Sequence, residues 1–225
     1  DIRAGFGDLA KKLSAYEVVG TDYRDPSERS FNAAAVFDPE GQLIARYDKN
    51  QLVPMGEWVP FRRFIPFGDF FHLPDDSTPG PPDQIISAGP FQLCTLICFE
   101  SAFSRLAADR TKAGANLIVC LTNDSWSGQV AMQQQHYILA VFRAIENRRW
   151  VVCSATTGMT GFVSPAGKMD RMEPYKEGSL TANAALRTDR TTYANIGDLL
   201  PIFCGLAMVG FGYKKTIPSE KSEAK

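Results

Sequence analysis

Strand-like and helix-like segments alternate along this chain, and that alternation constrains its fold more than any other feature. The stretches "SAFSRLAADRTKAGA" and "QQQHYILAVFRAIENRR" have helical periodicity and alternate with apolar runs such as "NLIVCLTN" and "WVVCSATTG". Strands that alternate with helices indicate a layered α/β sheet. At 225 residues the chain can bury one substantial core and does not require two domains. We therefore predict one α/β domain.

Short turns indicate that the sheet is mixed rather than parallel. Both "SFNAAAVFDPEGQLIARYDK" and "DQIISAGPFQLCTLICFE" consist of two strand-like runs joined by a few residues that include glycine. Such turns connect antiparallel neighbours, whereas parallel neighbours need longer crossovers. Further elements are predicted as a helix at 4–15, a strand at "YEVVGTDY" and a strand at "TGFVSPAGKMD".

Charge and cysteine spacing exclude two classes of function. The net charge of −1 and the isoelectric point near 6.2 provide no broad basic surface, so nucleic acid is not an expected partner. The five cysteines are widely spaced and form no CxxC pair, which disfavours a disulfide framework or a zinc site. We expect core thiols and one reactive thiol. The core thiols are Cys94, Cys120 and Cys153.

The reactive candidate is Cys98, in the stretch "LICFES". It lies near the end of an apolar run at 91–99, predicted as a buried strand, and Glu100 follows it. Open α/β folds collect their chemistry at such strand ends. Two loops of unusual content, "YDKNQLVPMGEWVPF" and "TNDSWSG", also follow predicted strands. Together the three segments offer Lys49, Glu57, Cys98, Glu100, Asn123, Asp124 and Trp126 for a common site.

Five segments in this order resemble the nitrilase superfamily and, within it, the catalytic domain of the apolipoprotein N-acyltransferase family. They are "YDKNQLVPMGEWVPF", "ICFES", "NDSWSG", "QQHYILAVFRAIENRR" and "ATTGMTGFVSPAGK". The resemblance implies a four-layer αββα sandwich and a Glu-Lys-Cys catalytic triad. It assigns the nucleophile to Cys98 and the lysine to Lys49, and it makes Glu57 a second glutamate of the site.

The same resemblance implies supporting roles and one missing residue. Glu100 matches the acidic residue beside the family's cysteine, and Phe99 occupies a position where tyrosine is common. Asn123 and Trp126 are expected to bind substrate or support the site. The triad's first glutamate belongs to a motif that the resemblance locates upstream of Asp1. The chain is therefore expected to be truncated at its N-terminus and inactive by itself.

These residue types suit acyl chemistry. A cysteine attacks an acyl carbon as its thiolate, and a nearby cation such as Lys49 favours that state. The same ammonium can stabilise the oxyanion that forms when the carbonyl is attacked. This scheme requires no histidine, metal or cofactor. We expect His136 to pack or hydrogen-bond on its own helix, and Arg143 to pair with Glu146 three residues later.

The stretch 199–213 is uncharged and is followed by Lys214 and Lys215. It is shorter than the ~20 residues that a spanning helix usually needs, and a buried helix or a dimer arm is the alternative. It lacks a polar face, which favours a transmembrane helix at 196–215. The catalytic domain would then be 1–195 and the polar tail 216–225. Lysines that remain cytoplasmic would place the catalytic domain on the periplasmic side of a bacterial inner membrane.

The resemblance therefore implies an acyltransferase with two lipid substrates. Cys98 would take an acyl chain from a phospholipid as a thioester, and the N-terminal amine of a diacylglyceryl apolipoprotein would then remove it. Two alternatives stay open. One is a nitrilase-superfamily amidase that hydrolyses a small amide, and the other is a catalytically silent domain that binds lipid or a partner.

Overall fold

The computed structural model describes residues 2–64 and 76–216, and its strands form two sheets. The first sheet is antiparallel, in the order β1-β2-β3, and the second has the order β4-β5-β6-β7-β8-β9. Strands β5, β6 and β7 are parallel and their outer neighbours are antiparallel, so the predicted mixed sheet is confirmed. The strands are β1 Glu17–Arg24, β2 Ser30–Phe37, β3 Leu43–Asp48, β4 Ile86–Ala88, β5 Phe91–Ile97, β6 Leu117–Thr122, β7 Val151–Ala155, β8 Thr160–Val163 and β9 Met169–Met172.

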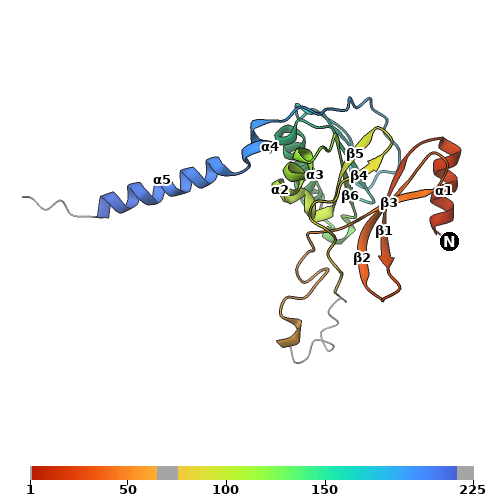
Figure 1. The fold of residues 1–225 in the computed structure, drawn as a ribbon, viewed down its shortest axis with the longest axis horizontal. Helices are drawn as coiled ribbons and strands as arrows, with labels where there is room; N and C mark the ends of the chain where they lie inside the picture. The colour runs from red at the N-terminus through yellow and green to blue at the C-terminus, as the bar shows by residue number, and fades with distance from the viewer. Residues whose placement is uncertain (1, 65–75, 217–225) are drawn as a thin grey trace, which may run out of the picture.

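Helices cover the outer face of each sheet. The described helices are α1 Ile2–Leu13, α2 Ser104–Lys112, α3 Val130–Asn147, α4 Thr192–Ile196 and α5 Leu199–Thr216. Short 3-10 segments at Arg62–Phe64, Cys98–Ala102 and Ser125–Ser127 lie in the loops. In Figure 1, α2 and α3 lie against the second sheet and α1 lies on the far side of the first.

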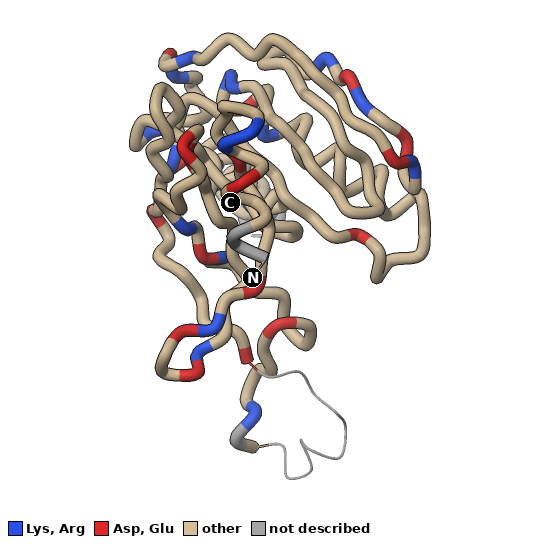
Figure 2. The backbone as a smooth tube through the Cα atoms, turned by 90° about the vertical axis from the view of Figure 1, so that its right-hand side faces the viewer, with Lys and Arg blue, Asp and Glu red and all other residues tan. Residues whose placement is uncertain are grey.

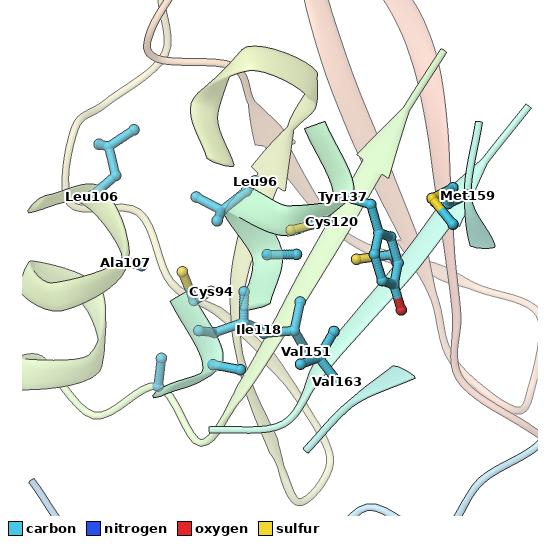
Figure 3. Close-up of a cluster of buried hydrophobic side chains, with 14 residues drawn as sticks. Cys94, Leu96, Leu106, Ala107, Ile118, Cys120, Tyr137, Val151, Met159 and Val163 are labelled. Carbon is cyan, nitrogen blue, oxygen red and sulfur yellow. The ribbon is translucent and has the colours of Figure 1, made fainter. Parts of the chain in front are cut away.

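Alternation along β2 explains how the layers pack. Successive side chains of a strand point to opposite faces. Ala34 and Val36 pack into a cluster with Leu93, Leu117 and other residues of the second sheet, while Ala35 packs against α1. A separate cluster, which includes Cys94, Cys120 and Cys153, joins the second sheet to α2 and α3 (Figure 3). The layers are therefore helix, sheet, sheet and helix, as the resemblance implied, and these three cysteines are core residues as expected.

Two predicted element boundaries were wrong. The stretch "TGFVSPAGKMD" forms β8 and β9 rather than one strand, because the chain reverses between them. The reversal is closed by hydrogen bonds from the Gly167 amide to the Ser164 carbonyl (2.8 Å) and from the Ser164 amide to the Lys168 carbonyl (2.8 Å). Gly167 has a φ of +81°, a conformation that glycine adopts without a steric penalty. The strand predicted at 91–99 ends at Ile97, because the chain turns into a 3-10 segment at Cys98.

Charged residues of both signs are interspersed along the backbone (Figure 2), in keeping with the net charge of −1. The predicted pair on α3 is confirmed, with Arg143 Nη2 2.8 Å from Glu146 Oε2.

The last helix, α5, projects from the sandwich (Figure 1). Its apolar side chains are exposed, including Leu206 and Val209 at about 70%. Within residues 2–64 and 76–216, no helix combines the length and hydropathy needed to cross a membrane.

Candidate active site

Cys98 begins the turn that follows β5, and its backbone is in the left-handed region. Its φ is +52°, which is uncommon for a residue other than glycine. Such conformations persist where surrounding contacts hold them, and they cluster at functional sites. The Cys98 carbonyl accepts hydrogen bonds from the Ser101 hydroxyl (3.1 Å) and from Nε2 of His136 (2.9 Å). The nucleophile predicted from the sequence therefore lies on a main chain held from two directions.

Glu100 connects this turn to the loop that carries Lys49. Its carboxylate is fully buried and accepts hydrogen bonds from three main-chain amides, those of Ile97 (2.8 Å), Asn50 (2.8 Å) and Gln51 (3.0 Å). The Tyr47 hydroxyl donates to the same carboxylate at 2.8 Å. Glu100 does not line the cavity that Cys98 and Lys49 share, so its contacts join the two loops.

A buried arginine, Arg110 on α2, offsets the charge of Glu100. Its Nη2 donates to the Tyr47 hydroxyl (2.8 Å), and its Nη1 donates to the Thr95 carbonyl (2.6 Å). Burial raises the pKa of Tyr47 far above its ordinary value, and the adjacent Glu100 charge raises it further. Tyr47 therefore stays a neutral hydroxyl that bridges the two charges. Arg110 was not predicted from the sequence, although an arginine on the same helix as the buried Ala107 and Ala108 is a candidate for a buried charge.

Lys49 and Glu57 form a pair at the base of the lysine loop. Lys49 is 1% exposed, and its ammonium lies 2.8 and 2.7 Å from the two Glu57 oxygens. Glu57 also accepts hydrogen bonds from the Asn32 side-chain amide (2.7 Å) and the Val53 main-chain amide (2.8 Å). Three donor groups make four hydrogen bonds to the Glu57 carboxylate, two to each oxygen. Its contacts fix the position of the Lys49 ammonium.

One cavity of about 760 Å³ brings most of the candidate residues together. Lys49, Glu57 and Cys98 line it, and much of the remaining wall is apolar. Trp126 lines it while remaining 68% exposed, so it stands at the opening. Of the residues predicted from the sequence, Glu100 is absent from this wall. The other lining residues are Val53, Gly56, Phe99, Asn123, Asp124, Ser127, Met132, Gln133, Gln135, His136 and Leu139.

His136 was predicted to pack or hydrogen-bond on its own helix, and that prediction was wrong. Both of its ring nitrogens hydrogen-bond to residues outside α3. Nδ1 lies 2.8 Å from Oδ1 of Asp124, and Nε2 lies 2.9 Å from the Cys98 carbonyl. Burial by itself would lower the pKa of His136, but the hydrogen bond and charge of Asp124 outweigh it and raise that pKa. The sequence gave a hint of this contact, since His136 lies on the helix that follows the "NDSWSG" loop and Asp124 belongs to that loop.

The same three residues are spaced closely enough to raise the question of a metal. Ligand atoms of Cys98, Asp124 and His136 lie within 4.8 Å of one another. Both ring nitrogens and Oδ1 of Asp124, however, are already engaged in hydrogen bonds. The donor set therefore fits a hydrogen-bonded cluster better than a metal centre.

The arrangement can support covalent acyl chemistry. A thiol and a buried ammonium line one cavity with a largely apolar wall, and apolar surroundings strengthen electrostatic interactions. A cationic donor in such surroundings can stabilise an oxyanion at an attacked carbonyl.

Comparison with known proteins agrees with this architecture. The family model for carbon-nitrogen hydrolases matches residues 2–191. The apolipoprotein N-acyltransferase of Geobacter metallireducens is 34% identical over 215 residues, which are 89% of this chain and 40% of that protein. The chain thus spans about two fifths of the length of this curated relative.

Solved structures share the fold at lower identity. A carbon-nitrogen hydrolase from Helicobacter pylori G27 superposes with a TM-score of 0.62 at 17% identity, covering 78% of this chain and 64% of that one. A cysteine-to-serine variant of the Nesterenkonia AN1 amidase, from the nitrilase superfamily, gives 0.57 at 20% identity over 76% of this chain and 63% of that one. With a family model that matches most of its length, the chain belongs to the carbon-nitrogen hydrolase family.

Proposed function

We propose that this chain carries the catalytic cysteine of an acyltransferase that moves an acyl chain from a phospholipid to the N-terminal amine of a diacylated apolipoprotein. In the first step the Cys98 thiolate attacks an ester carbonyl of the phospholipid. A C–S bond forms, the C–O bond to glycerol breaks, and the glycerol oxygen takes up a proton to leave as a lysophospholipid. Lys49 donates to the oxyanion during this attack.

In the second step the lipoprotein amine attacks the thioester. A C–N bond forms, the C–S bond breaks, and the Cys98 thiolate is regenerated. The amine releases one proton, which balances the proton that the glycerol oxygen took up in the first step. The resemblance assigns these proton transfers to a glutamate that no motif within residues 1–225 matches. The roles proposed for this chain are those of Cys98 as nucleophile, Lys49 as oxyanion donor and Glu57 as the group that fixes Lys49.

The size and lining of the cavity carry this proposal. About 760 Å³ lies in the upper part of the range for ligand pockets, and Val53, Phe99, Met132 and Leu139 contribute apolar wall. An acyl chain needs such a wall, whereas a small amide would leave most of it unfilled. The likeness to a protein named apolipoprotein N-acyltransferase supports the same choice over an amidase.

We further propose that α5 inserts into the membrane that holds these lipids. Its apolar side chains are exposed in the isolated chain, with Phe203 and Met208 about 70% accessible, and burying apolar area stabilises by ~25 cal/mol per Å². Flotation with phospholipid vesicles tests this proposal. The chain should float with vesicles, and replacing Phe203, Leu206 and Val209 together by serine should leave it at the bottom of the gradient. Equal flotation of both forms would exclude α5 as the membrane contact.

The function is tested by following both lipids in vesicles. The protein that contains this chain is incubated with a phospholipid labelled in one acyl chain and a diacylated lipopeptide, and products are separated by mass. Labelled N-acyl lipopeptide is expected, in an amount equal to the lysophospholipid. Labelled free fatty acid alone, with hydrolysis of small amides, would instead establish an amidase. Failure to form either product or any thioester would indicate a silent lipid-binding domain.

A further inference from the structure

We propose that His136, held by Asp124, is a positioning residue that keeps the main chain of Cys98 in its left-handed conformation. The inference rests on the proposed role of Cys98 as nucleophile. The Cys98 carbonyl accepts hydrogen bonds from Nε2 of His136 and from the Ser101 hydroxyl. Without them the carbonyl would be free to rotate as the turn relaxed. Holding that carbonyl fixes the peptide plane after Cys98.

The partners of His136 define its protonation state. A main-chain carbonyl and an ionised carboxylate are both acceptors, so each ring nitrogen must donate. An imidazole ring with N–H groups on both nitrogens is an imidazolium cation. His136 therefore forms an ion pair with Asp124 on one side and a charge-assisted hydrogen bond with the nucleophile's carbonyl on the other.

Asp124 is itself held in place. The Thr122 hydroxyl donates to its Oδ1 (2.8 Å), and its side chain is 5% exposed. Gly158 lies against its other oxygen, since a Cβ at position 158 would be 2.3 Å from Oδ2. A carboxylate packed this closely has little freedom to turn away from the ring.

Charged and polar groups from three loops act on the protonation of His136. Asp124, after β6, favours the protonated ring, and so does the hydrogen bond to the Cys98 carbonyl after β5. Lys49, after β3, opposes it, and burial of the ring opposes it most. Tyr137, the neighbour on α3, stays neutral because burial raises its pKa well above the ordinary value. The balance raises the pKa of His136 above its ordinary value.

The pH dependence follows from this balance. Below the raised pKa both hydrogen bonds are present. As the pH rises through it, the ring loses one proton, and the Nδ1–H that faces the Asp124 charge is the one retained. The Nε2 lone pair then faces the lone pairs of the Cys98 carbonyl, and this contact becomes repulsive. The turn should therefore loosen on the alkaline side of the His136 pKa.

The protonation state can be measured directly, because the chain has only two histidines. In a His72→Gln background, ring ¹⁵N resonances report His136 alone. We expect an imidazolium at pH 6 that titrates above the ordinary ~6.5, and we expect Asp124→Asn to lower that pKa. A neutral ring at pH 6, or an Asp124→Asn variant with an unchanged titration, would overturn the proposal.

The effect on Cys98 can be measured without any lipid substrate. The probe is iodoacetamide, which alkylates accessible thiols. Peptide mass spectrometry distinguishes labelled Cys98 from the exposed Cys204. A single-cysteine peptide in the same tube corrects the rate for the ordinary rise of thiol reactivity with pH. The corrected rate for the wild type should fall above the His136 pKa. In Asp124→Asn that fall should begin at lower pH.

Two substitutions of His136 separate positioning from packing. The amide nitrogen of His136→Gln can reach the Cys98 carbonyl but does not titrate, so this variant should lose less than about tenfold in corrected rate and show no alkaline fall. His136→Ala should lose about 100-fold, the order expected for a misplaced reacting group. Variants are compared by thermal unfolding first. If the folded Gln and Ala variants react equally, or if the Gln variant keeps the alkaline fall, His136 does not position the nucleophile. Such a result would leave the proposed acyl transfer standing, because that function is tested separately by the assay with labelled phospholipid.

Discussion

Replacing Cys98 by alanine should abolish acyl transfer. The thiol is the atom proposed to form the covalent bond, and removing a catalytic nucleophile typically lowers turnover by a factor on the order of 10⁶. Cys98→Ser should be almost as inactive, because a hydroxyl is much harder to ionise than a thiol. Intact-mass measurement of the wild type with phospholipid alone should find one acyl group, and peptide mapping should locate it on Cys98.

Cys204→Ala is the matched control for this experiment. Cys204 is the other thiol outside the core, and it is exposed on α5, so its loss should leave the acyl adduct and the rate of transfer unchanged. An adduct on Cys204, or transfer at the wild-type rate by Cys98→Ala, would refute the assignment of the nucleophile.

Replacing Lys49 by methionine should slow acylation by about 10²–10³-fold, equivalent to ~3–4 kcal/mol, the loss expected for one oxyanion donor. Phospholipid binding should change much less, because the charge is needed mainly as the oxyanion develops. Lys49→Arg should not restore the rate, since a planar guanidinium cannot occupy the place of an ammonium held between two Glu57 oxygens. Single-turnover acylation and equilibrium binding to vesicles measure the two quantities separately.

Charge balance provides the control for Lys49. Removing the ammonium alone leaves the Glu57 carboxylate without its partner, and breaking a buried pair in this way is destabilising. The double variant Lys49→Met/Glu57→Gln should recover stability in urea while staying slow in acylation. Lys11→Met, on the exposed side of α1, should affect neither. Normal turnover with weakened binding in Lys49→Met would show that Lys49 contacts a lipid head group instead.

Much of the candidate site could be predicted because its residues follow strands. The parallel strands β5 and β6 end at the same edge of their sheet, so Cys98 and the "NDSWSG" loop had to lie close together. Lys49 follows β3, in the other sheet. Its place opposite Cys98 came from the resemblance, because no local pattern specifies how two sheets stack.

The features that were missed depend on contacts between distant segments. Glu100 was expected to bind substrate or support the site, but the sequence did not show which groups would hold it: three amides and a tyrosine hydroxyl from two loops converge on its carboxylate. His136 was expected to interact within its helix, and its partners lie 12 and 38 residues away. Helical spacing describes which face a residue occupies, but it does not identify the groups opposite that face.

The inward position of Glu100 has a consequence for the order of folding. Its partners Tyr47, Asn50 and Gln51 are about 50 residues away along the chain, and they belong to the other sheet and the loop that leaves it. Contacts of such large sequence separation form only after the entropy of closing the intervening chain has been lost, which makes them slow. Until the sheets dock, Glu100 would lack its donors Tyr47, Asn50 and Gln51, and the Lys49 ammonium would not face the cavity that Cys98 lines. A partly folded chain with intact hairpins should therefore have an ordinary cysteine, and the reactive geometry should arise in the last, global step of folding.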